Sequence, residues 1–373
     1  MSLEPKPTQT ILVLAGPTGG HLFPAWAFAE ALKESHPGCR ICLITGKRAQ
    51  RLGQEFQSSP FDQVYYAQDF HGISLSPLKL ISSLWRASRA LGQAFVWIRR
   101  EKPSLAAGFG SYASVPGVLL CFLMRIPVLL HEQNKIAGKA TRFLMPFARC
   151  LAASFEGTQP NESKGKTWVV TGLPIRQKLL AGASTFKRQF DLPRLTWLIV
   201  GGSQGARRIN ETVSKTLMLL SPEESEKIAV IHITGQQDFE RIKKDYSELK
   251  FPTHVYPFFD KMHELFPQID FALTRAGANT LFELALFGVP AAVVPYPHAG
   301  AHQKDNADAF EKAGALVLQD ESSLSSDLLL RMIRIFISDA GLRQRLSKNI
   351  RMLAKPDAAK VLAEKAWALL EAL

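Results

Sequence analysis

Short, continuous apolar runs alternate with amphipathic stretches along the whole chain. The run at residues 10–15 (TILVLA) is typical of a strand buried on both faces of a parallel sheet. Residues 23–35 follow it with the periodicity of a helix, and residues 40–45 form a second apolar run. Further strands are predicted at residues 105–108, 128–131 and 151–153. This regular alternation of strand and helix predicts an α/β protein with parallel sheets.

The second half of the chain repeats the same pattern. Residues 196–200 (TWLIV) lead into a glycine-rich turn at 201–206, and a helix is predicted from 207 to 220. Further strands are expected at 229–234, 270–274 and 291–294. We therefore predict two Rossmann-like domains, over residues 1–173 and 174–355. The C-terminal segment 356–373 is expected to be a helix that packs back on the first domain.

The composition is that of a globular protein with more than one core. The 373 residues are 46% hydrophobic and 21% charged, which excludes a disordered chain. Four cysteines are too few for a disulfide framework, so a reducing compartment is expected, and the Cys39/Cys42 pair is interpreted as strand packing. Residues 1–9 lack the apolar stretch of a signal peptide, and the longest apolar run, 115–124, is too short to span a bilayer.

The formal charge of +12 is unevenly distributed. Residues 1–172 carry 19 Lys and Arg against 10 Asp and Glu, whereas residues 173–373 carry 26 against 23. A basic surface attracts nucleic acid, anionic lipid or phosphorylated substrates. The charge alone does not distinguish among these partners, but it directs attention to the first half of the chain.

The first predicted strand runs directly into the turn Gly16-Pro17-Thr18-Gly19-Gly20-His21. Glycines there let a backbone approach a ligand, and a helix N-terminus offers N–H groups to an anion. The turn lacks both the GxGxxG pattern and the Lys-Ser/Thr pair, and no acidic residue follows the second strand, so nicotinamide and Walker-type sites are disfavoured. His21 is a candidate general base, and the alternative is a capping or packing histidine.

Two more strand-to-helix turns are candidate anion sites in the second half. The first is the segment 201–206 (GGSQGA), in which the Ser203 hydroxyl and backbone N–H groups are suited to a phosphate. The second is the segment 275–280 (RAGANT), whose helix carries Glu283 one turn further on. We expect Glu283 either to accept hydrogen bonds from a ribose or to be a solvated helix residue.

Polar side chains also cluster after two other predicted strands. The segment 131–134 (HEQN) places four hydrogen-bonding side chains at a strand end, which indicates the rim of a site. The loop 298–306 contains two histidines, but no other ligand spacing supports a metal. The chain also lacks the Asp-x-Asp arrangement that often holds a divalent ion against a nucleotide-sugar diphosphate. We therefore expect neither a metal site nor a cofactor.

The stretch 78–100 combines leucines and tryptophans with a series of basic residues. At helical spacing Lys79, Arg86, Arg89 and Arg100 share one face, although Gly92 is a possible break. An apolar surface with tryptophans beside a basic face is suited to an anionic membrane. A buried helix with one solvated side fits the pattern equally well.

Taken together, five segments resemble the signatures of the MurG family of bacterial glycosyltransferases. They are residues 16–25 (GPTGGHLFPA), 108–117 (GFGSYASVPG), 131–138 (HEQNKIAG), 201–207 (GGSQGAR) and 275–283 (RAGANTLFE). The resemblance extends over nearly the whole chain, with the motifs in the same order. It implies a GT-B fold, in which two Rossmann-like parallel-sheet domains face each other across a cleft.

The resemblance also implies a reaction. It is the inverting transfer of N-acetylglucosamine from UDP-N-acetylglucosamine to the 4-hydroxyl of undecaprenyl-pyrophosphoryl-N-acetylmuramoyl-pentapeptide, which converts lipid I to lipid II in peptidoglycan synthesis. The first domain would take the lipid-linked acceptor and the second the UDP-sugar. The protein would be peripheral on the cytoplasmic face of the inner membrane, against anionic lipid, with other cell-wall enzymes as possible partners and without nucleic acid.

Individual residues match family positions. His21 matches the expected base. Tyr112 and Glu132 match positions that line the cleft and are, with His21, the expected catalytic residues, and Asn134 matches a donor contact. Thr18, Gly19 and Gly20 match the loop that closes over the donor. The remaining positions match contacts to the UDP-sugar: Arg176, Ser203, Gln204, Phe259, Ala278, Asn279, Thr280, Leu281, Phe282, Glu283, His302 and Gln303.

Four positions depart from the family pattern: Pro17 and Ser111 stand where the family has glycines, Leu173 where it commonly has asparagine, and Asn279 where it often has leucine. None removes a chemically required group, although Pro17 removes one N–H donor. Two alternatives stay open. One is another GT-B enzyme that acts on UDP-sugars, such as a UDP-N-acetylglucosamine 2-epimerase or a glycolipid transferase. The other is a non-catalytic polyanion-binding module.

Overall fold

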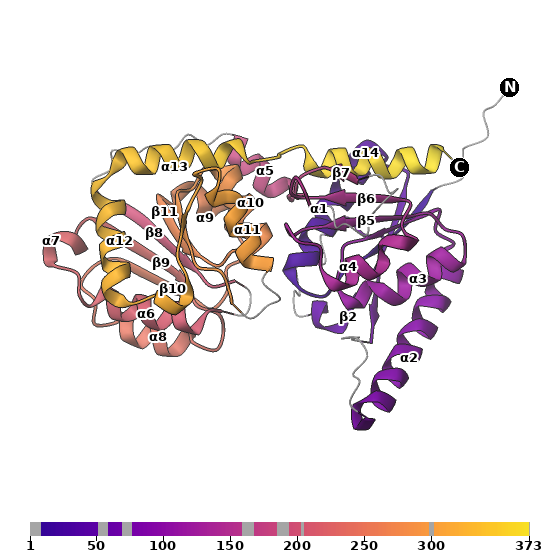
Figure 1. Cartoon of the computed structure of the whole chain (residues 1–373), viewed down its shortest axis with the longest axis horizontal. Coiled ribbons are helices and arrows are strands. Elements are labelled where there is room, and N and C mark those ends of the chain that lie inside the picture. The colour runs from indigo at the N-terminus through magenta and orange to yellow at the C-terminus, as the bar shows by residue number, and fades with distance from the viewer. Residues whose placement is uncertain are drawn as a thin grey trace. The chain divides into compact units, whose positions relative to one another are not determined.

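The chain folds into two compact α/β units. The computed structural model describes residues 9–50, 59–68, 77–158, 168–184, 194–202, 205–297 and 302–372, and the side chains of residues 77–84 lie outside this description. Unit 1 runs to Gln177 and also contains the C-terminal segment from Pro356, and unit 2 is Lys178–Lys355 (Figure 1). The chain thus leaves unit 1 after Gln177 rather than after Leu173.

Unit 1 is built on a parallel sheet that has seven strands within the described residues, in the order β3-β2-β1-β4-β5-β6-β7. Neighbouring strands pair in parallel throughout. The edge strands β3 and β7 were not predicted from the sequence. The strands are β1 (Thr10–Leu14), β2 (Arg40–Gly46), β3 (Gln63–Ala67), β4 (Leu105–Gly108), β5 (Val128–Glu132), β6 (Cys150–Ala153) and β7 (Trp168–Val170).

Helices cover both faces of this sheet. They are α1 (Gly19–Ser35), α2 (Pro77–Glu101), α3 (Val115–Leu123), α4 (Lys139–Leu144) and α14 (Ala358–Glu371), with 3-10 turns η2 (Tyr112–Ser114) and η3 (Met145–Phe147). Ile11 and Val13 of β1 pack in a core with α1 and α14, while Leu12 and Leu14 pack in a second core with α2, α3 and α4. The continuous apolar run of β1 is therefore buried on both faces, as predicted.

The structure corrects one local prediction for unit 1 and decides one that the sequence left open. Helix α1 begins at Gly19, not near residue 23, because the Thr18 carbonyl already accepts the N–H groups of His21 and Leu22 (3.0 Å each). Helix α2 continues through Gly92, since Ala90, Ala94 and Ile98 bury its opposite face. No helix among the described residues is both long and apolar enough to cross a membrane.

The C-terminal helix α14 packs on α1 in the first core. Leu362 and Ala366 are fully buried there, and the Trp367 ring stacks on the His36 imidazole at the end of α1 with the two ring centroids 3.5 Å apart. Because buried apolar side chains stabilise a helix more than its own propensity does, this contact keeps the last segment of the chain in unit 1.

Unit 2 repeats the architecture with a parallel sheet of six described strands in the order β10-β9-β8-β11-β12-β13. Trp197 of β8 stacks on Phe271 of β11, and Phe271 stacks on Phe336 of α12. The strands are β8 (Leu195–Val200), β9 (Ile228–Ile233), β10 (Thr253–Tyr256), β11 (Phe271–Thr274), β12 (Ala291–Val293) and β13 (Val317–Leu318).

The first helix of unit 2 is α5 (Gln177–Ser184). Its first residue, Gln177, still belongs to unit 1, and unit 2 begins at Lys178. The others are α6 (Arg207–Leu217), α7 (Pro222–Ser225), α8 (Phe239–Tyr246), α9 (Met262–Leu265), α10 (Ala278–Phe287), α11 (His302–Glu311), α12 (Ser326–Ser338) and α13 (Ala340–Met352), with turns η5 (Phe266–Gln268) and η6 (Glu321–Ser323). In both units, the segments that follow the strand ends carry the candidate motifs.

Candidate functional site

The carboxyl ends of three neighbouring strands bring the candidate residues of unit 1 together. In the parallel ladder Leu14 of β1 pairs with Gly108 of β4, and Gly108 pairs with Leu130 of β5. The segments that begin at Gly16, Phe109 and His131 therefore leave the sheet at the same edge, which is where open α/β sheets bind ligands.

His21 is the best-defined polar group at this edge. Its Nδ1 lies 2.8 Å from the Phe109 carbonyl oxygen, and Gln133 Nε2 donates to the same oxygen at 2.9 Å. Because a carbonyl only accepts hydrogen bonds, Nδ1 carries the proton and Nε2 of the neutral ring keeps its lone pair. The residue as a whole is half-buried. The ring is therefore oriented with Nε2 able to accept a proton.

The surroundings of His21 favour the neutral ring. Burial lowers the pKa of His21 below its ordinary value, and this outweighs the raising effects of the Glu132 charge and of the hydrogen bonds to Phe109 and Gln133. A neutral imidazole near pH 7 is the form that a general base requires. Gln133 was predicted only as part of the polar segment 131–134, without a contact to His21, and the Phe109 carbonyl was not predicted at all. Phe109 acts here through its backbone, which no side-chain pattern in the sequence reveals.

Glu132 organises the loop that follows β5. Its buried carboxylate accepts the Asn134 N–H (3.0 Å) and the Asn134 side-chain amide (3.1 Å) on Oε1, and the Gly138 N–H (3.0 Å) on Oε2. Three hydrogen bonds to one carboxylate hold the loop and orient Asn134. His131, next to it, is fully buried and tied to Gly172 and Ser154 rather than exposed to a ligand.

The turn between β4 and α3 lies directly against His21. A Cβ atom added to Gly16 would be 2.6 Å from Ser111 Cβ and 3.0 Å from His21 Cδ2, so the Ser111 side chain and the imidazole share the space beside Gly16. Ser114 Oγ donates to the carbonyls of Gly110 and Ser111, both at 2.8 Å. Tyr112 is 39% exposed on this turn, which leaves its ring accessible to a ligand.

The glycine-rich turn after β1 opens α1 as a helix N-terminus. Thr18 is the N-cap without a side-chain cap, and Thr18 and Gly20 are exposed. A side chain on Gly19 would be 2.9 Å from the Phe23 ring, whereas nothing lies within 4 Å of one on Gly20. The Arg176 guanidinium lies 4.0 Å from the Phe23 ring centroid. Arg176 thus belongs to unit 1, whereas the predicted boundary assigned it to the second domain.

The matching turn of unit 2 follows β8. Ser203 and Gln204 lie outside the described residues. On either side of them, Gly202 and Gly205 have φ of 86° and 77°, and a Cβ on Gly201 would be 2.5 Å from the Ala206 nitrogen. Only glycine accommodates these positions without strain, so the close turn predicted from the sequence is present.

The N-terminus of α10 is the second candidate anion site of unit 2. Ala278, Leu281 and Phe282 are buried, so only their backbone can contact a ligand, and the Leu281 N–H is already accepted by Gly277 O. Asn279 and Thr280 are half-buried in the first turn, which has no acidic residue. Glu283, one turn on, is also half-buried. The positive end of the helix is thus available to an anion without a competing carboxylate.

Arg275, which opens this motif, is a brace and not an exposed anion ligand. Its guanidinium is buried, donates to the carbonyls of Val294 and Pro295, and pairs with Glu321. It also lies 5.3 Å from the Tyr296 ring centroid. Arg275 therefore holds the segment after β12 in place.

The remaining candidates lie around the same segment. Gln303 Oε1 accepts the Tyr296 N–H at 3.0 Å, so Gln303 of α11 holds the Tyr296 turn. His302 is half-buried, and its Nδ1 has no hydrogen-bond partner among the described residues. Phe259, in the loop after β10, is half-buried and packs edge-on against Tyr256 with centroids 5.0 Å apart.

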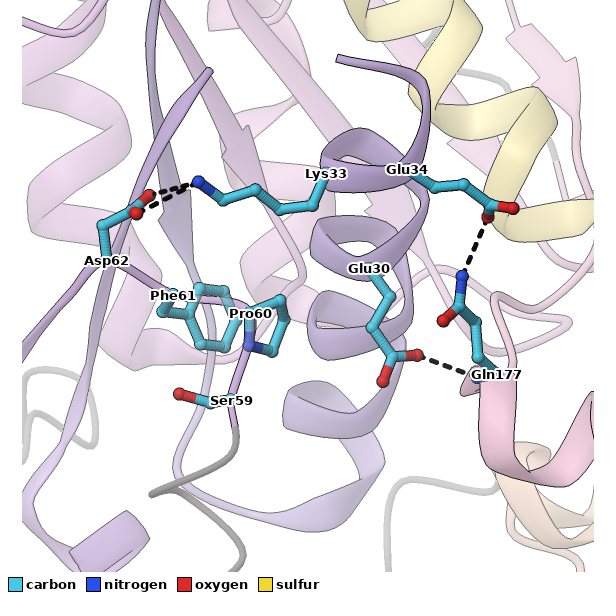
Figure 2. Close-up of a pocket in the computed structure, with 8 residues that line it drawn as sticks. All are labelled: Glu30, Lys33, Glu34, Ser59, Pro60, Phe61, Asp62 and Gln177. Carbon is cyan, nitrogen blue, oxygen red and sulfur yellow. Dashed lines mark hydrogen bonds and ion pairs between the residues drawn. The ribbon is translucent and has the colours of Figure 1, made fainter. Parts of the chain in front are cut away.

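An open pocket of about 750 Å³ in unit 1 lies apart from these motifs (Figure 2). Figure 2 shows Glu30 and Glu34 of α1 directed to Gln177, which donates its N–H and side-chain amide to them at 2.8 Å each, while Lys33 pairs with Asp62. None of the described candidate residues lines this pocket. Its charged side chains are paired with one another or with Gln177, and the Gln177 hydrogen bonds link the end of unit 1 to α1.

Known proteins resemble the chain along almost its full length. Models of the glycosyltransferase family 28 N-terminal and C-terminal domains match residues 11–153 and 196–362. The UDP-N-acetylglucosamine–N-acetylmuramyl-(pentapeptide) pyrophosphoryl-undecaprenol N-acetylglucosamine transferase of Coxiella burnetii is 36% identical over 93% of this chain and 95% of its own length. The protein of the same name from Brucella canis is 32% identical over 97% of this chain and 94% of its own.

Solved structures share the two-unit α/β fold. The crystal structure of Acinetobacter baumannii MurG, at 27% identity, has a TM-score of 0.74 and is matched over 97% of this chain and 100% of that one. A UDP-N-acetylglucosamine 2-epimerase from Neisseria meningitidis, at 12% identity, has a TM-score of 0.66 over 96% of this chain and 100% of that one, and shows a common fold alone. On the family models and the full-length relatives, the chain belongs to glycosyltransferase family 28 and, within it, to the MurG family.

Proposed function

We propose that this protein transfers N-acetylglucosamine from UDP-N-acetylglucosamine to N-acetylmuramyl-(pentapeptide) pyrophosphoryl-undecaprenol, the lipid I to lipid II step of peptidoglycan synthesis. The observation that carries the proposal is the relationship over 93–97% of the chain to transferases of this name. The predicted fold class, two parallel-sheet α/β units of the GT-B type, agrees with it. The chain is accordingly an enzyme of the glycosyltransferase class.

On the acceptor side, unit 1 supplies the base. The acceptor hydroxyl attacks the anomeric carbon of the sugar, and His21 Nε2 takes the proton as the new C–O bond forms and the bond to the diphosphate breaks. The hydrogen bond from Nδ1 to Phe109 O fixes the ring and its tautomer. Glu132 acts by holding Asn134 and the loop, and not by touching the reacting atoms. Tyr112, on the exposed turn, contacts the acceptor.

On the donor side, unit 2 binds the UDP-sugar. The N-terminus of α10, at Ala278 to Thr280, places the positive end of a helix dipole at the diphosphate, where negative charge builds as UDP leaves. Ser203 and Gln204 supply further donors. Glu283 accepts hydrogen bonds from the ribose, Phe259 packs on the uracil, and Gln303 with His302 contacts the sugar. The assignment of Thr18, Gly19 and Gly20 to a loop over the donor, and of Arg176 to a donor contact, stays a prediction from the family resemblance.

The direct test is transfer of labelled N-acetylglucosamine from UDP-N-acetylglucosamine to a short-chain lipid I analogue, with UDP-glucose as a control donor. Product from the N-acetylated donor alone is the expected result. Epimerised sugar released from UDP-N-acetylglucosamine without any lipid acceptor would instead support a 2-epimerase. Absence of product while UDP still binds would make the acceptor assignment wrong.

His21→Ala tests the base. Removal of a general base lowers turnover by ~10²–10⁴, while UDP affinity should stay near that of the wild type because unit 2 binds the nucleotide. His36→Ala is the matched control, since His36 is the histidine at the other end of α1 and stacks on Trp367. Full turnover in His21→Ala would eliminate this residue as the base.

An exposed apolar surface on unit 1 is suited to the membrane that holds the acceptor. We call it the α2–α4 surface, and it consists of Trp85, Phe95 and Val96 of α2, Phe122 and Leu123 of α3, and Phe143 of α4. Trp85 is 56% exposed and Leu123 is 73% exposed. In Figure 1 the N-terminal end of α2 extends away from the rest of unit 1. Isolated exposed apolar side chains are ordinary, whereas a group on adjoining helices indicates a binding surface.

Basic side chains accompany the α2–α4 surface. The Arg89 guanidinium lies 4.7 Å from the Trp85 ring centroid, and Arg99 lies 5.7 Å from that of Phe95. Aromatic and basic groups together are suited to the anionic cytoplasmic leaflet, where each Lys or Arg near the surface contributes about 1 kcal/mol. We therefore propose anionic lipid, and not nucleic acid, as the partner of the charge excess in the first half of the chain. The Lys79 side chain, predicted for the same face, lies outside the described side chains.

Vesicle binding tests this role. Arg86→Glu with Arg89→Glu, and separately Leu123→Ser, should each reduce co-sedimentation with vesicles of anionic phospholipid. Met352→Ser, which removes an equally prominent apolar side chain (65% exposed) from unit 2, should not. If all three variants bound the vesicles as well as the wild type does, the α2–α4 surface would face solvent and not a membrane.

A further inference from the structure

Ser111 has a backbone conformation that side chains rarely adopt. Its φ of 69° and ψ of 149° fall in a region populated almost entirely by glycine. Two other described non-glycine residues, Lys102 (φ 46°) and Arg125 (φ 61°), also have positive φ, but they follow the ends of α2 and α3, where left-handed residues commonly terminate helices. Ser111 does not end a helix, so its strain has another origin.

The surrounding turn holds Ser111 in this conformation. Ser114 Oγ donates to the Ser111 carbonyl and to the Gly110 carbonyl at 2.8 Å each, and Ser111 Oγ accepts the Ala113 N–H at 3.4 Å. A glycine at position 111 could keep the first two of these hydrogen bonds without the strain. The side chain of Ser111 is therefore maintained at a conformational cost, which is a feature of functional sites.

The Ser111 side chain lies beside the Cδ2 side of the His21 ring. Ser111 Cβ and Oγ lie 2.6 and 2.7 Å from the point where a Gly16 side chain would begin, and His21 Cδ2 lies 3.0 Å from the same point. Cδ2 is bonded to Nε2, the nitrogen left with its lone pair because Nδ1 is bound to Phe109 O. Ser111 therefore lies near Cδ2, the ring carbon next to the nitrogen that accepts the proton.

We propose that Ser111 is a positioning residue for the acceptor. Its side chain occupies space beside the His21 ring and so limits the direction from which the acceptor hydroxyl can reach Nε2. This inference rests on the proposed function. Because a misplacement of about 1 Å can cost ~10²-fold in rate, a small side chain beside the ring is sufficient to select the orientation of the attacking hydroxyl.

Three variants test the proposal in the transfer assay. Ser111→Gly removes the side chain and the strain, and Ser111→Ala keeps the strain and the Cβ but removes Oγ. Lys102→Gly, our matched control, relieves a positive φ at the opposite, amino-terminal edge of the sheet, where Ser104 bonds to Thr10. Ser111→Gly should unfold at higher urea concentration than the wild type, yet lose about tenfold to a hundredfold in kcat/KM for the acceptor, with KM for UDP-N-acetylglucosamine unchanged. Lys102→Gly should change neither kinetic constant.

The outcomes separate the inference from the proposed function. If kcat/KM for the acceptor falls in Ser111→Gly but not in Ser111→Ala, the Cβ atom of Ser111 positions the acceptor. If it falls equally in both variants, the hydroxyl does so. Either result supports the proposal. Ser111→Gly with higher stability and wild-type kinetics would overturn it. If the wild-type chain itself transfers no sugar to the lipid I analogue, the proposed function fails instead.

Discussion

Acid should destabilise unit 2 through one buried histidine, His232 of β9. Its ring is fully buried, with Nε2 3.0 Å from Asn210 Oδ1 and Nδ1 2.7 Å from the Tyr246 hydroxyl. Burial lowers the pKa of His232 from 6.5 to about 3, and the Asp238 charge opposes this only in part. His131 in unit 1 resembles it, with a pKa lowered by burial to about 4. The folded protein therefore keeps both rings neutral where the unfolded chain takes up protons.

The sign and size follow from linkage. A pKa that is lower in the folded state means that stability is fully present above pH 6.5 and is lost as the pH falls toward the folded pKa. Each pH unit below 6.5 costs about 1.4 kcal/mol per histidine, so unit 2 should lose about 2 kcal/mol between about pH 7 and about pH 5. Carboxylates contribute little in this window because their ordinary pKa values lie near 4.

His232→Gln provides the test, because unit 1 contains His21 as well as His131 and would mix two lowered pKa values. Trp197 is the one tryptophan of unit 2 and is buried, so fluorine NMR of 5-fluorotryptophan-labelled protein in urea reports this unit. The variant should be less stable at both pH values but should lack the additional loss of about 2 kcal/mol at about pH 5. The same acid loss in the variant and the wild type would refute His232 as the linked group.

Three substitutions complete the predictions, each measured by urea unfolding. Gly92→Ala adds a methyl group to an exposed position of α2 with nothing within 4 Å, and should stabilise the protein by about 0.5–1 kcal/mol; no gain would mean that α2 is not helical there in solution. Gly16→Ala meets Ser111 Cβ at 2.6 Å and should destabilise by about 1–3 kcal/mol and lower turnover, with the unobstructed Gly20→Ala as the stability control. Arg275→Met leaves the Glu321 carboxylate without its buried partner and should cost about 3–5 kcal/mol; a smaller loss would show that Glu321 is solvated once Arg275 is removed.

The sequence by itself determined the layout of strands, helices and glycine-rich turns. An uninterrupted apolar run such as residues 10–15 has to be buried on both faces, and β1 is. Glycine-rich turns after such runs predicted tight turns, and glycine is indeed required where the backbone turns tightly or leaves room for a neighbour, as at Gly205 and Gly16. The five family motifs could also be recognised without the structure, because they consist of particular residue types at fixed spacings.

Only the tertiary structure decided what individual groups contact. The orientation of His21 depends on the Phe109 carbonyl, which lies 88 positions away in the sequence. Because every residue has a backbone carbonyl, the sequence does not reveal this contact. The sequence assigned no contact to Arg275, whereas the structure buries it against Glu321 and two carbonyls. The left-handed backbone of Ser111 is likewise set by the surrounding turn. Periodicity specifies which face of an element is buried, whereas hydrogen bonds between distant segments depend on the register of the folded sheet, which is why these contacts were out of reach of the sequence.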